Sequence, residues 1–243
     1  MFVKDNLLKI KSHIPAGVKL IAVSKYRPVE TLKVAYDAGQ RIFGENRVQE
    51  LVDKQPLLPE DIEWHFIGTL QTNKVRFIAP FISMIQSVDT LKLLHEINRQ
   101  AQKNNRIIRV LIEVHIAEEE SKHGFAVADC KSFFLDRMQN HFTNIEVCGL
   151  MGMATFINDM EQVRREFKTL LTLFNDIKTM PTTNASLFTE MSMGMSDDYQ
   201  IAIEEGSTMV RIGTALFNDE INGTLPIPPQ KEGNDNIQQP LSL

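Results

Sequence analysis

The sequence predicts a single (β/α)₈ barrel. Short apolar, β-branched runs alternate with longer stretches of helical spacing from residue 19 to residue 217. Near-continuous apolar strands joined by helices are typical of a parallel sheet that is covered on both faces. Such units fit a compact barrel, whose active site lies at the C-terminal ends of the strands. An open doubly wound sheet is the alternative, but no G-x-G-x-x-G fingerprint follows the first run.

Eight apolar runs are the predicted strands, and the predicted helices lie between them. The runs are KLIAVSK (19–25), RIFGEN (41–46), EWHFIG (63–68), ISMIQSV (82–88), IIRVLIEVHI (107–116), IEVCGLMGM (145–153), LFTEMSM (187–193) and MVRIGTALF (209–217). A short amphipathic helix is expected before the first run. Pro28 suits the first turn of a helix, and Gly39 and Gly206 suit helix C-caps.

The composition fits one sizeable domain, since 43% of the 243 residues are hydrophobic and the net charge is only −5. The sequence contains no Lys/Arg cluster of the kind that binds a phosphate backbone, so nucleic acid is not expected as a partner. Cys130 and Cys148 are too few for a disulfide framework, and residues 1–13 contain no apolar signal-peptide core. The longest apolar stretch is broken by Pro80 and is too short to cross a bilayer. We therefore expect a reduced, cytoplasmic protein with no membrane span.

The chain is expected to divide into a barrel over residues 1–217 and a mobile C-terminal tail over residues 218–243. The tail is rich in Pro, Asn and Gln and has no apolar period. Because the eighth run ends near Phe217, we expect no second folded domain.

Lys25 ends the first apolar run, just before a helix-start signal. Strand side chains alternate, so Ile21, Val23 and Lys25 share one face of that run. If Leu20 and Ala22, on the other face, meet the helices, Lys25 points into the barrel mouth. The alternative is a solvated lysine at a strand end, because lysines are mostly exposed.

A candidate anion site spans the ends of the last two runs, where barrels frequently bind phosphate. Gly194 lets the backbone approach a ligand closely, and Ser196 is a good N-cap for the helix that follows. A helix start presents unpaired N–H groups to an anion. Gly213 and Thr214 add two more donors. The alternative is that Gly194 and Gly213 only serve tight turns.

Three charged residues near this site need an explanation. Asp197 and Asp198 would repel a phosphate if they pointed inward, so we expect them to face away. Arg211 lies on the face of its run that points into the barrel. A buried guanidinium needs a partner, which is either a barrel carboxylate such as Glu113 or Glu190, or a ring nitrogen of a cofactor.

A lysine, an anion cradle and an inward arginine at one end of a barrel suggest a Schiff-base lysine that holds pyridoxal 5′-phosphate (PLP). The aldehyde of PLP condenses with a lysine, its phosphate is the anion, and its pyridine nitrogen needs a partner. An arginine partner stays protonated and disfavours a proton on the ring nitrogen. The ring is then a poorer electron sink, which does not favour demanding carbanion chemistry.

Specific motifs extend this interpretation over nearly the whole chain. They are AVSK ending at Lys25, FGENRVQE (43–50), WHFIGTLQTNK (64–74), ESKHG (120–124), GLM (149–151) and MSMGMSDDYQIAIEEGSTMVRIGTALF (191–217). With these motifs the sequence resembles the pyridoxal-phosphate homeostasis protein family, whose members look like the barrel of alanine racemase without its second domain. By that resemblance Lys25 carries PLP as an internal aldimine. Ser192, Gly213 and Thr214 contact its phosphate, and Arg211 approaches the pyridine nitrogen.

Other positions are assigned less directly. Asn46, beside Glu45 at the end of the second run, is a candidate residue of the mouth, and its alternative role is a helix N-cap. His115 and the MATF segment depart from the commoner family pattern, which leaves details of the pocket rim open. Lys122 aligns with a lysine of the family's E-x-x-K-x-G pattern, and its alternative is a solvated loop lysine.

No metal site is expected, because His65 and His115 have no acidic neighbour at fixed spacing. Trp64 is assigned to packing.

The predicted function is PLP binding for intracellular PLP homeostasis, by storage, shielding or delivery, without robust catalytic turnover. Apo forms of PLP enzymes are candidate recipients, and a monomer is expected because the domain that builds racemase dimers is missing. One alternative is a small PLP-dependent amino-acid racemase or lyase with Lys25 and a barrel tyrosine or lysine as bases. Another is an aldolase-like barrel whose lysine attacks a sugar phosphate without a cofactor.

Overall fold

The computed structural model, which describes residues 2–118, 123–136 and 142–218, contains a closed barrel of parallel strands in chain order. The barrel closes where the first strand pairs with the last. The strands are β1 (Lys19–Val23), β2 (Ile42–Glu45), β3 (Glu63–Phe66), β4 (Met84–Val88), β5 (Ile108–Val114), β6 (Ile145–Gly152), β7 (Glu190–Ser192) and β8 (Met209–Ile212). Each strand lies within its predicted run, so the predicted fold is confirmed.

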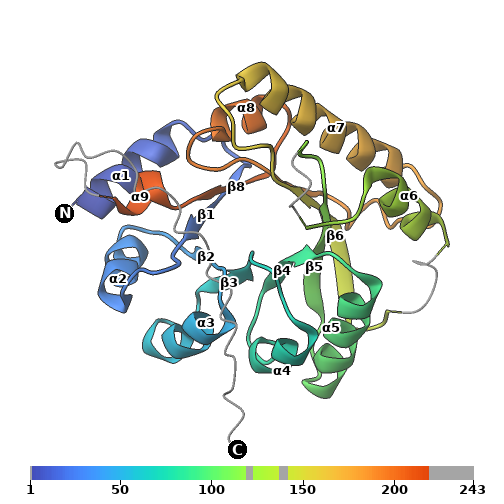
Figure 1. Ribbon diagram of the computed structural model, residues 1–243. Coiled ribbons are helices and arrows are strands. Elements are labelled where there is room, and N and C mark those ends of the chain that lie inside the picture. The colour runs from blue at the N-terminus through green and yellow to red at the C-terminus, as the bar shows by residue number, and fades with distance from the viewer. Residues whose placement is uncertain (1, 119–122, 137–141, 219–243) are drawn as a thin grey trace, which may run out of the picture.

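A helix follows each strand and covers the outside of the barrel (Figure 1). These helices are α2 (Val29–Asp37), α3 (Val48–Lys54), α4 (Val75–Ile78), α5 (Leu91–Lys103), α6 (Val127–Asp136), α7 (Met160–Lys178), α8 (Tyr199–Glu204) and α9 (Thr214–Phe217). Helix α1 (Phe2–Ser12) precedes β1, and the short turns η1 (Gln55–Leu57) and η2 (Thr72–Lys74) lie in loops. Across the described part of the chain, no helix has both the length and the apolar character needed to span a bilayer.

The core has two layers, as the alternation of strand side chains predicts. Leu20 and Ala22 pack outward in the large cluster between strands and helices, whereas Ile21 packs inward. The inner cluster fills the barrel and consists of Ile21, Met84, Leu111, Cys148, Met151 and Met209. The predicted orientation of the first strand is therefore confirmed.

The eighth predicted run is too long, because the chain leaves the barrel after Ile212. Ala22 of β1 is the last register partner of β8, and Gly213 then forms the N-cap of α9. The apolar pattern continues past the strand because Leu216 and Phe217 are buried in the outer cluster. A continuous apolar run therefore hid a change from strand to helix.

Helices α1 and α9 lie side by side, and they hold the end of the described chain against the barrel (Figure 1). The Asn6 side chain donates to the carbonyl oxygens of Leu216 and Asn218, at 3.2 and 3.1 Å. Asn218, which the sequence assigned to the tail, thus contacts the barrel. Residues 219–243 lie outside the described residues.

Candidate cofactor site at the barrel mouth

Lys25 lies in a tight turn at the C-terminal end of β1. The turn runs from Ser24 to Arg27 and is closed by a hydrogen bond from the Arg27 N–H to the Ser24 carbonyl, at 3.1 Å. Lys25 is exposed, and its side chain has no hydrogen bond or ion pair with any described residue. The ammonium group is therefore accessible at the end of the barrel where ligands bind in this fold.

Arg211 lies on β8 and points into the barrel, since its register partner on β1 is Ile21 of the inner cluster. The residue is only 4% exposed. Its guanidinium donates to the Ser192 hydroxyl at 2.7 Å and to the Gly152 carbonyl at 3.1 Å. Burial lowers the pKa of Arg211 to about 10, so the group stays charged at neutral pH.

Neither carboxylate suggested by the sequence pairs with Arg211 among the described residues. Glu190 accepts hydrogen bonds from Lys19 and Arg109, at the opposite end of the barrel. Glu113 lies 4% exposed on β5, with no hydrogen bond or ion pair to its carboxylate among these residues. Burial, reinforced by Asp89 and opposed by Arg211, raises the pKa of Glu113 to about 7. Among the described residues, the hydrogen-bond partners of Arg211 are therefore neutral.

A buried polar chain runs from Arg211 down into the barrel. Ser192 is fully buried, and its hydroxyl donates to Gln86 Oε1 at 2.7 Å. Gln86 Nε2 donates in turn to His65 Nδ1 at 2.8 Å, which assigns the His65 proton to Nε2. Burial, with Arg109 and Lys19, lowers the pKa of His65 to about 3 and keeps the ring neutral. The Ser192 hydroxyl is therefore engaged by Arg211 and Gln86.

Gln86 was not predicted as a site residue, although the sequence contains a signal for it. A glutamine inside the apolar run ISMIQSV occupies a strand that the structure buries throughout. A buried amide requires hydrogen-bond partners, and these are supplied across the barrel.

The loop after β7 meets the start of α9. The Ser196 hydroxyl accepts a hydrogen bond from the Ala215 N–H at 3.3 Å. Ser196 was predicted to cap α8, and that prediction is wrong. The helix begins later, at Tyr199, and its N-cap residue is Asp198. The Met195 N–H donates a hydrogen bond to Asp198 Oδ1 at 2.5 Å.

The two aspartates of this loop differ. Asp197 is exposed, as expected. Asp198 is half-buried, and burial raises its pKa while Arg211 opposes the rise. The expectation that both carboxylates face away therefore holds only for Asp197.

The two predicted glycines of the anion site both make close approaches, but to protein. Gly194 has a φ of +94°, and an added Cβ would lie 2.5 Å from Cβ of Ala202 on α8. An added Cβ on Gly213 would lie 3.1 Å from Val23. Gly213 also leads into the first turn of α9, where Thr214 and Ala215 carry N–H groups without intrahelical acceptors. Donors therefore gather where β8 ends.

Asn46 and Glu45, at the end of β2, have different environments. Asn46 is half-buried, and its Oδ1 atom is buried without a hydrogen-bond partner among the described residues. It does not cap α3, whose N-cap is Arg47 with no side-chain cap. Glu45 is fully buried and accepts from Ser24 Oγ at 2.6 Å and Lys54 Nζ at 2.7 Å. Glu45 is thus a buried partner of the Lys25 turn.

Three further residues were singled out in the sequence. Lys122 lies outside the described residues. His115 is half-buried, and its backbone N–H donates to Phe125 O at 2.9 Å. Trp64 packs against Phe43 with ring centroids 5.9 Å apart. No cluster of His, Cys, Asp or Glu side chains suited to a metal ion occurs among residues 2–118, 123–136 and 142–218.

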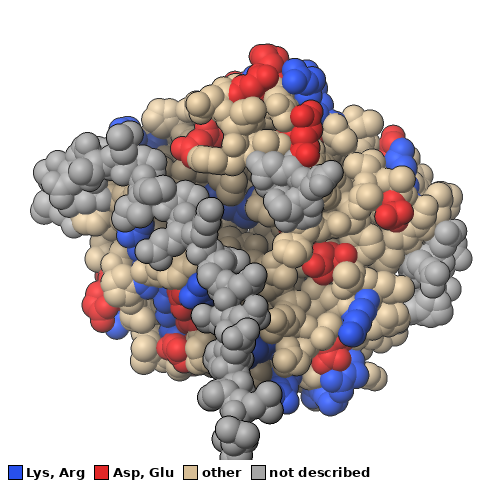
Figure 2. Space-filling model, in the orientation of Figure 1, with Lys and Arg blue, Asp and Glu red and all other residues tan. Residues whose placement is uncertain are grey.

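The face seen in Figure 2 has a central hollow with Lys or Arg side chains at its wall. Lys25, Arg211 and the donors around Gly213 all lie at the C-terminal ends of β1 and β8, which are neighbours in the barrel. The arrangement can hold a small anion and a ring with an unprotonated nitrogen beside an accessible amine.

Comparisons with known proteins identify the family of this chain. Residues 3–220 match the family model of the alanine racemase N-terminal domain. The pyridoxal phosphate homeostasis protein of Aquifex aeolicus is 41% identical over 202 residues, which cover 83% of this chain and 86% of that protein.

Solved structures extend the comparison to the fold. PipY of Synechococcus elongatus, solved with PLP bound, has a TM-score of 0.80 and 33% identity, and the match covers 89% of this chain and 100% of PipY. Alanine racemase of E. faecalis is similar in fold alone, with a TM-score of 0.68, 16% identity and coverage of 88% of this chain and 57% of the racemase. This chain therefore belongs to the pyridoxal phosphate homeostasis protein family, within the alanine racemase N-terminal domain superfamily of barrels.

Proposed function

We propose that this protein binds PLP at the barrel mouth through Lys25 and serves PLP homeostasis by holding and releasing the cofactor. The observation that carries the proposal is Arg211, a buried guanidinium that has no carboxylate partner among the described residues. Burying a cation without a counter-charge is costly unless another group compensates for it. A guanidinium can donate a hydrogen bond to an unprotonated pyridine nitrogen.

The other residues fit the same ligand. The accessible amine of Lys25 suits the aldehyde of PLP, which condenses with an amine and releases water. Thr214, Gly213 and Ser196 surround the place where β8 ends, and we assign them to the phosphate. The unpartnered Asn46 Oδ1 remains a candidate acceptor for a polar group of the ligand.

Ser192 receives a different role from the one that the family resemblance implies. Its hydroxyl already accepts from Arg211 and donates to Gln86. To donate to the phosphate, it would have to break its buried hydrogen bond to Gln86, which is unfavourable. We therefore assign Ser192 to holding the Arg211 guanidinium in place.

The arginine also favours holding the cofactor over turnover. Because Arg211 remains charged at neutral pH, it would donate a hydrogen bond to the ring nitrogen rather than protonate it. The exposed lysine leaves the bound aldehyde accessible to amines, as transfer to apo forms of PLP enzymes requires. We propose that the protein acts as a monomer in the cytoplasm, and sedimentation of the purified chain tests the oligomeric state.

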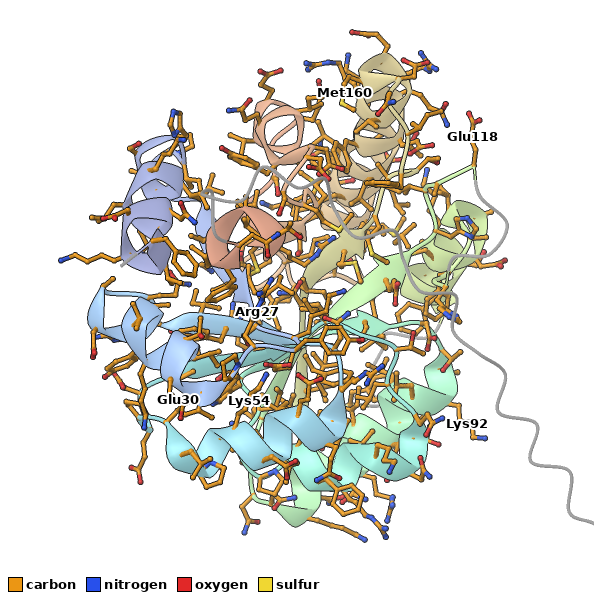
Figure 3. All side chains as sticks on the ribbon, turned by 60° about the vertical axis from the view of Figure 1, so that its left-hand side comes forward. Arg27, Glu30, Lys54, Lys92, Glu118 and Met160 are labelled. Carbon is orange, nitrogen blue, oxygen red and sulfur yellow. The ribbon has the colours of Figure 1, made fainter. Side chains whose placement is uncertain are left out.

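The test is an absorbance titration with PLP, followed by borohydride reduction and peptide mapping. We expect a band near roughly 420 nm, fixed by reduction onto the Lys25 peptide, and no such adduct in Lys25→Ala. Lys92→Ala is the matched control, because Lys92 is an exposed lysine on α5 (Figure 3). If the native protein forms no adduct with added PLP, the proposal fails and a cofactor-free lysine mechanism gains support.

One observation favours a second candidate, a small PLP-dependent racemase or lyase. Glu113, with a pKa of about 7, is an acid–base group on the inner face of the barrel, near Arg211. Tyr36, in contrast, is bound to Asp61 at the far end of α2 and is poorly placed as a base. Incubation of the PLP-loaded protein with L-amino acids in deuterated water tests this candidate, since racemisation would exchange the α-proton.

A further inference from the structure

The Lys25 turn rests on a buried charged cluster formed by Glu45, Glu50 and Lys54. Lys54 Nζ lies 2.7 Å from Glu45 Oε1 and 3.0 Å from Glu50 Oε2, and the Lys54 side chain is only 9% exposed. Burial raises the pKa of Glu45 although Lys54 and Ser24 oppose the rise. Buried ion pairs are often no more stabilising than apolar replacements. Stability alone therefore does not account for this cluster.

The cluster binds the backbone on both sides of Lys25. Lys54 Nζ donates to the Ser24 carbonyl at 2.9 Å. The Tyr26 N–H donates to Glu50 Oε2 at 2.8 Å, and this bond together with Lys54 lowers the pKa of Glu50 against the effect of burial. The residues before and after Lys25 are thus fixed, while the Lys25 side chain stays exposed. Figure 3 labels Lys54 together with Arg27, the last residue of the turn.

Tyr26 shows why the turn needs this support. Its φ is +61°, in the left-handed region that is unfavourable for a bulky side chain. Among the described residues, the other non-glycine residue with positive φ is Asn105, a type that tolerates this region. Such a conformation persists only where surrounding contacts hold it. The hydrogen bond from the Tyr26 N–H to Glu50 is one such contact, and the Arg47 guanidinium, 4.9 Å from the centroid of the Tyr26 ring, is another.

We infer that Glu45, Glu50 and Lys54 are positioning residues that hold Lys25 for bond formation with PLP. The inference rests on the proposed function. In that reaction the lone pair of Lys25 Nζ attacks the aldehyde carbon, a C=N bond forms and the carbonyl oxygen leaves as water. No oxidant or reductant is required. The reaction depends on the placement of the amine, so a displaced turn slows it without affecting sites for the ring and phosphate.

The experiment compares two ligands that differ only at the reacting group. PLP carries the aldehyde, whereas pyridoxine 5′-phosphate carries an alcohol there and cannot react with the lysine. For Glu50→Ala we expect the rate constant of adduct formation with PLP to fall roughly tenfold, the equivalent of one charge-assisted hydrogen bond. The Kd for pyridoxine 5′-phosphate should stay within about twofold. Glu50→Gln should lose less, because its amide oxygen still accepts from the Tyr26 N–H.

Two further variants separate positioning from folding. The double variant Glu45→Gln/Lys54→Met removes both charges of this buried pair together, so neither is left unpaired. We expect the same selective loss in the rate of adduct formation with PLP. Lys19→Met breaks the Lys19–Glu190 pair at the opposite end of the barrel and should leave the rate unchanged.

The outcomes are distinct. If the native protein forms no adduct, the proposed function and this inference both fail. If it forms the adduct and the folded variants match its rate, only the inference fails. If both ligands weaken equally, the cluster supports the fold and not the lysine, which also overturns the inference.

Discussion

Glu113 should make the empty protein lose stability as the pH rises from about 5 to 8. Its pKa is raised from the ordinary 4.5 to about 7, mainly by burial. The folded state therefore binds this proton more tightly than the unfolded chain does. Stability is highest where both states are protonated, below the unfolded pKa, and falls until the pH passes the folded pKa. The difference between the two pKa values corresponds to about 3 kcal/mol of free energy of unfolding.

Glu113→Gln removes this dependence, because the amide has nearly the same shape and no charge. The Glu113 carboxylate makes no hydrogen bond with a described residue, so the substitution sacrifices none that the structure shows. At pH 8 the variant should be more stable than the native protein by about 3 kcal/mol, or roughly 6–12 °C in Tm for a chain of this size. At pH 4 the two should be equal.

Urea unfolding of the PLP-free protein at pH 4, 6 and 8 measures both effects, with the m value as a check on two-state behaviour. Glu63→Gln is the control, since Glu63 is an exposed acid at the start of β3. An equal gain at pH 4 and pH 8, or no gain at either, would falsify the argument.

Three other substitutions follow from the geometry. Ser192→Ala should lower the free energy of unfolding by about 1–3 kcal/mol, because it leaves Gln86 Oε1 without its donor; an unchanged urea midpoint would contradict the buried chain. Gly194→Ala should lower the Tm clearly more than Gly17→Ala. Both positions have positive φ, but only at Gly194 would the added Cβ have a neighbour within 4 Å. Equal losses of Tm would refute the close approach. Lys25→Ala should change the stability of the PLP-free protein by less than about 0.5 kcal/mol in urea, because its side chain contacts no described partner, whereas added PLP should raise the Tm of the native protein alone.

The fold and the inward direction of Arg211 could be predicted because they depend on local periodicity. Strand alternation fixes which side of β8 faces the barrel, whatever the rest of the chain does. The family motifs added the hypothesis that Lys25 binds PLP. These features were all readable from short stretches of sequence.

The partners of these residues could not be predicted, because they come from strands and helices far apart in the chain. Ser192 and Gln86 are 106 positions apart, yet they share a hydrogen bond. Lys54 lies 30 positions after Ser24 and binds its carbonyl. A lysine at the end of a short helix has no local sign of burial. The N-cap of α8 was misplaced for a similar reason, since Ser196 and Asp198 are equally good caps by residue type.

On the proposed function, the position of the charges suits a cofactor that is bound and then released. A carboxylate at the ring nitrogen would stabilise a protonated ring and promote carbanion chemistry, but Arg211, with a pKa of about 10, keeps its own proton at neutral pH. Burial raises the pKa of Glu113 to about 7, so its charge changes near neutral pH, and Arg211 opposes the rise without an ion pair. On the proposed function, ionisation of Glu113 above pH 7 would draw the guanidinium away from the ring. PLP should therefore bind more weakly at pH 8 than at pH 6, and Glu113→Gln should remove that difference.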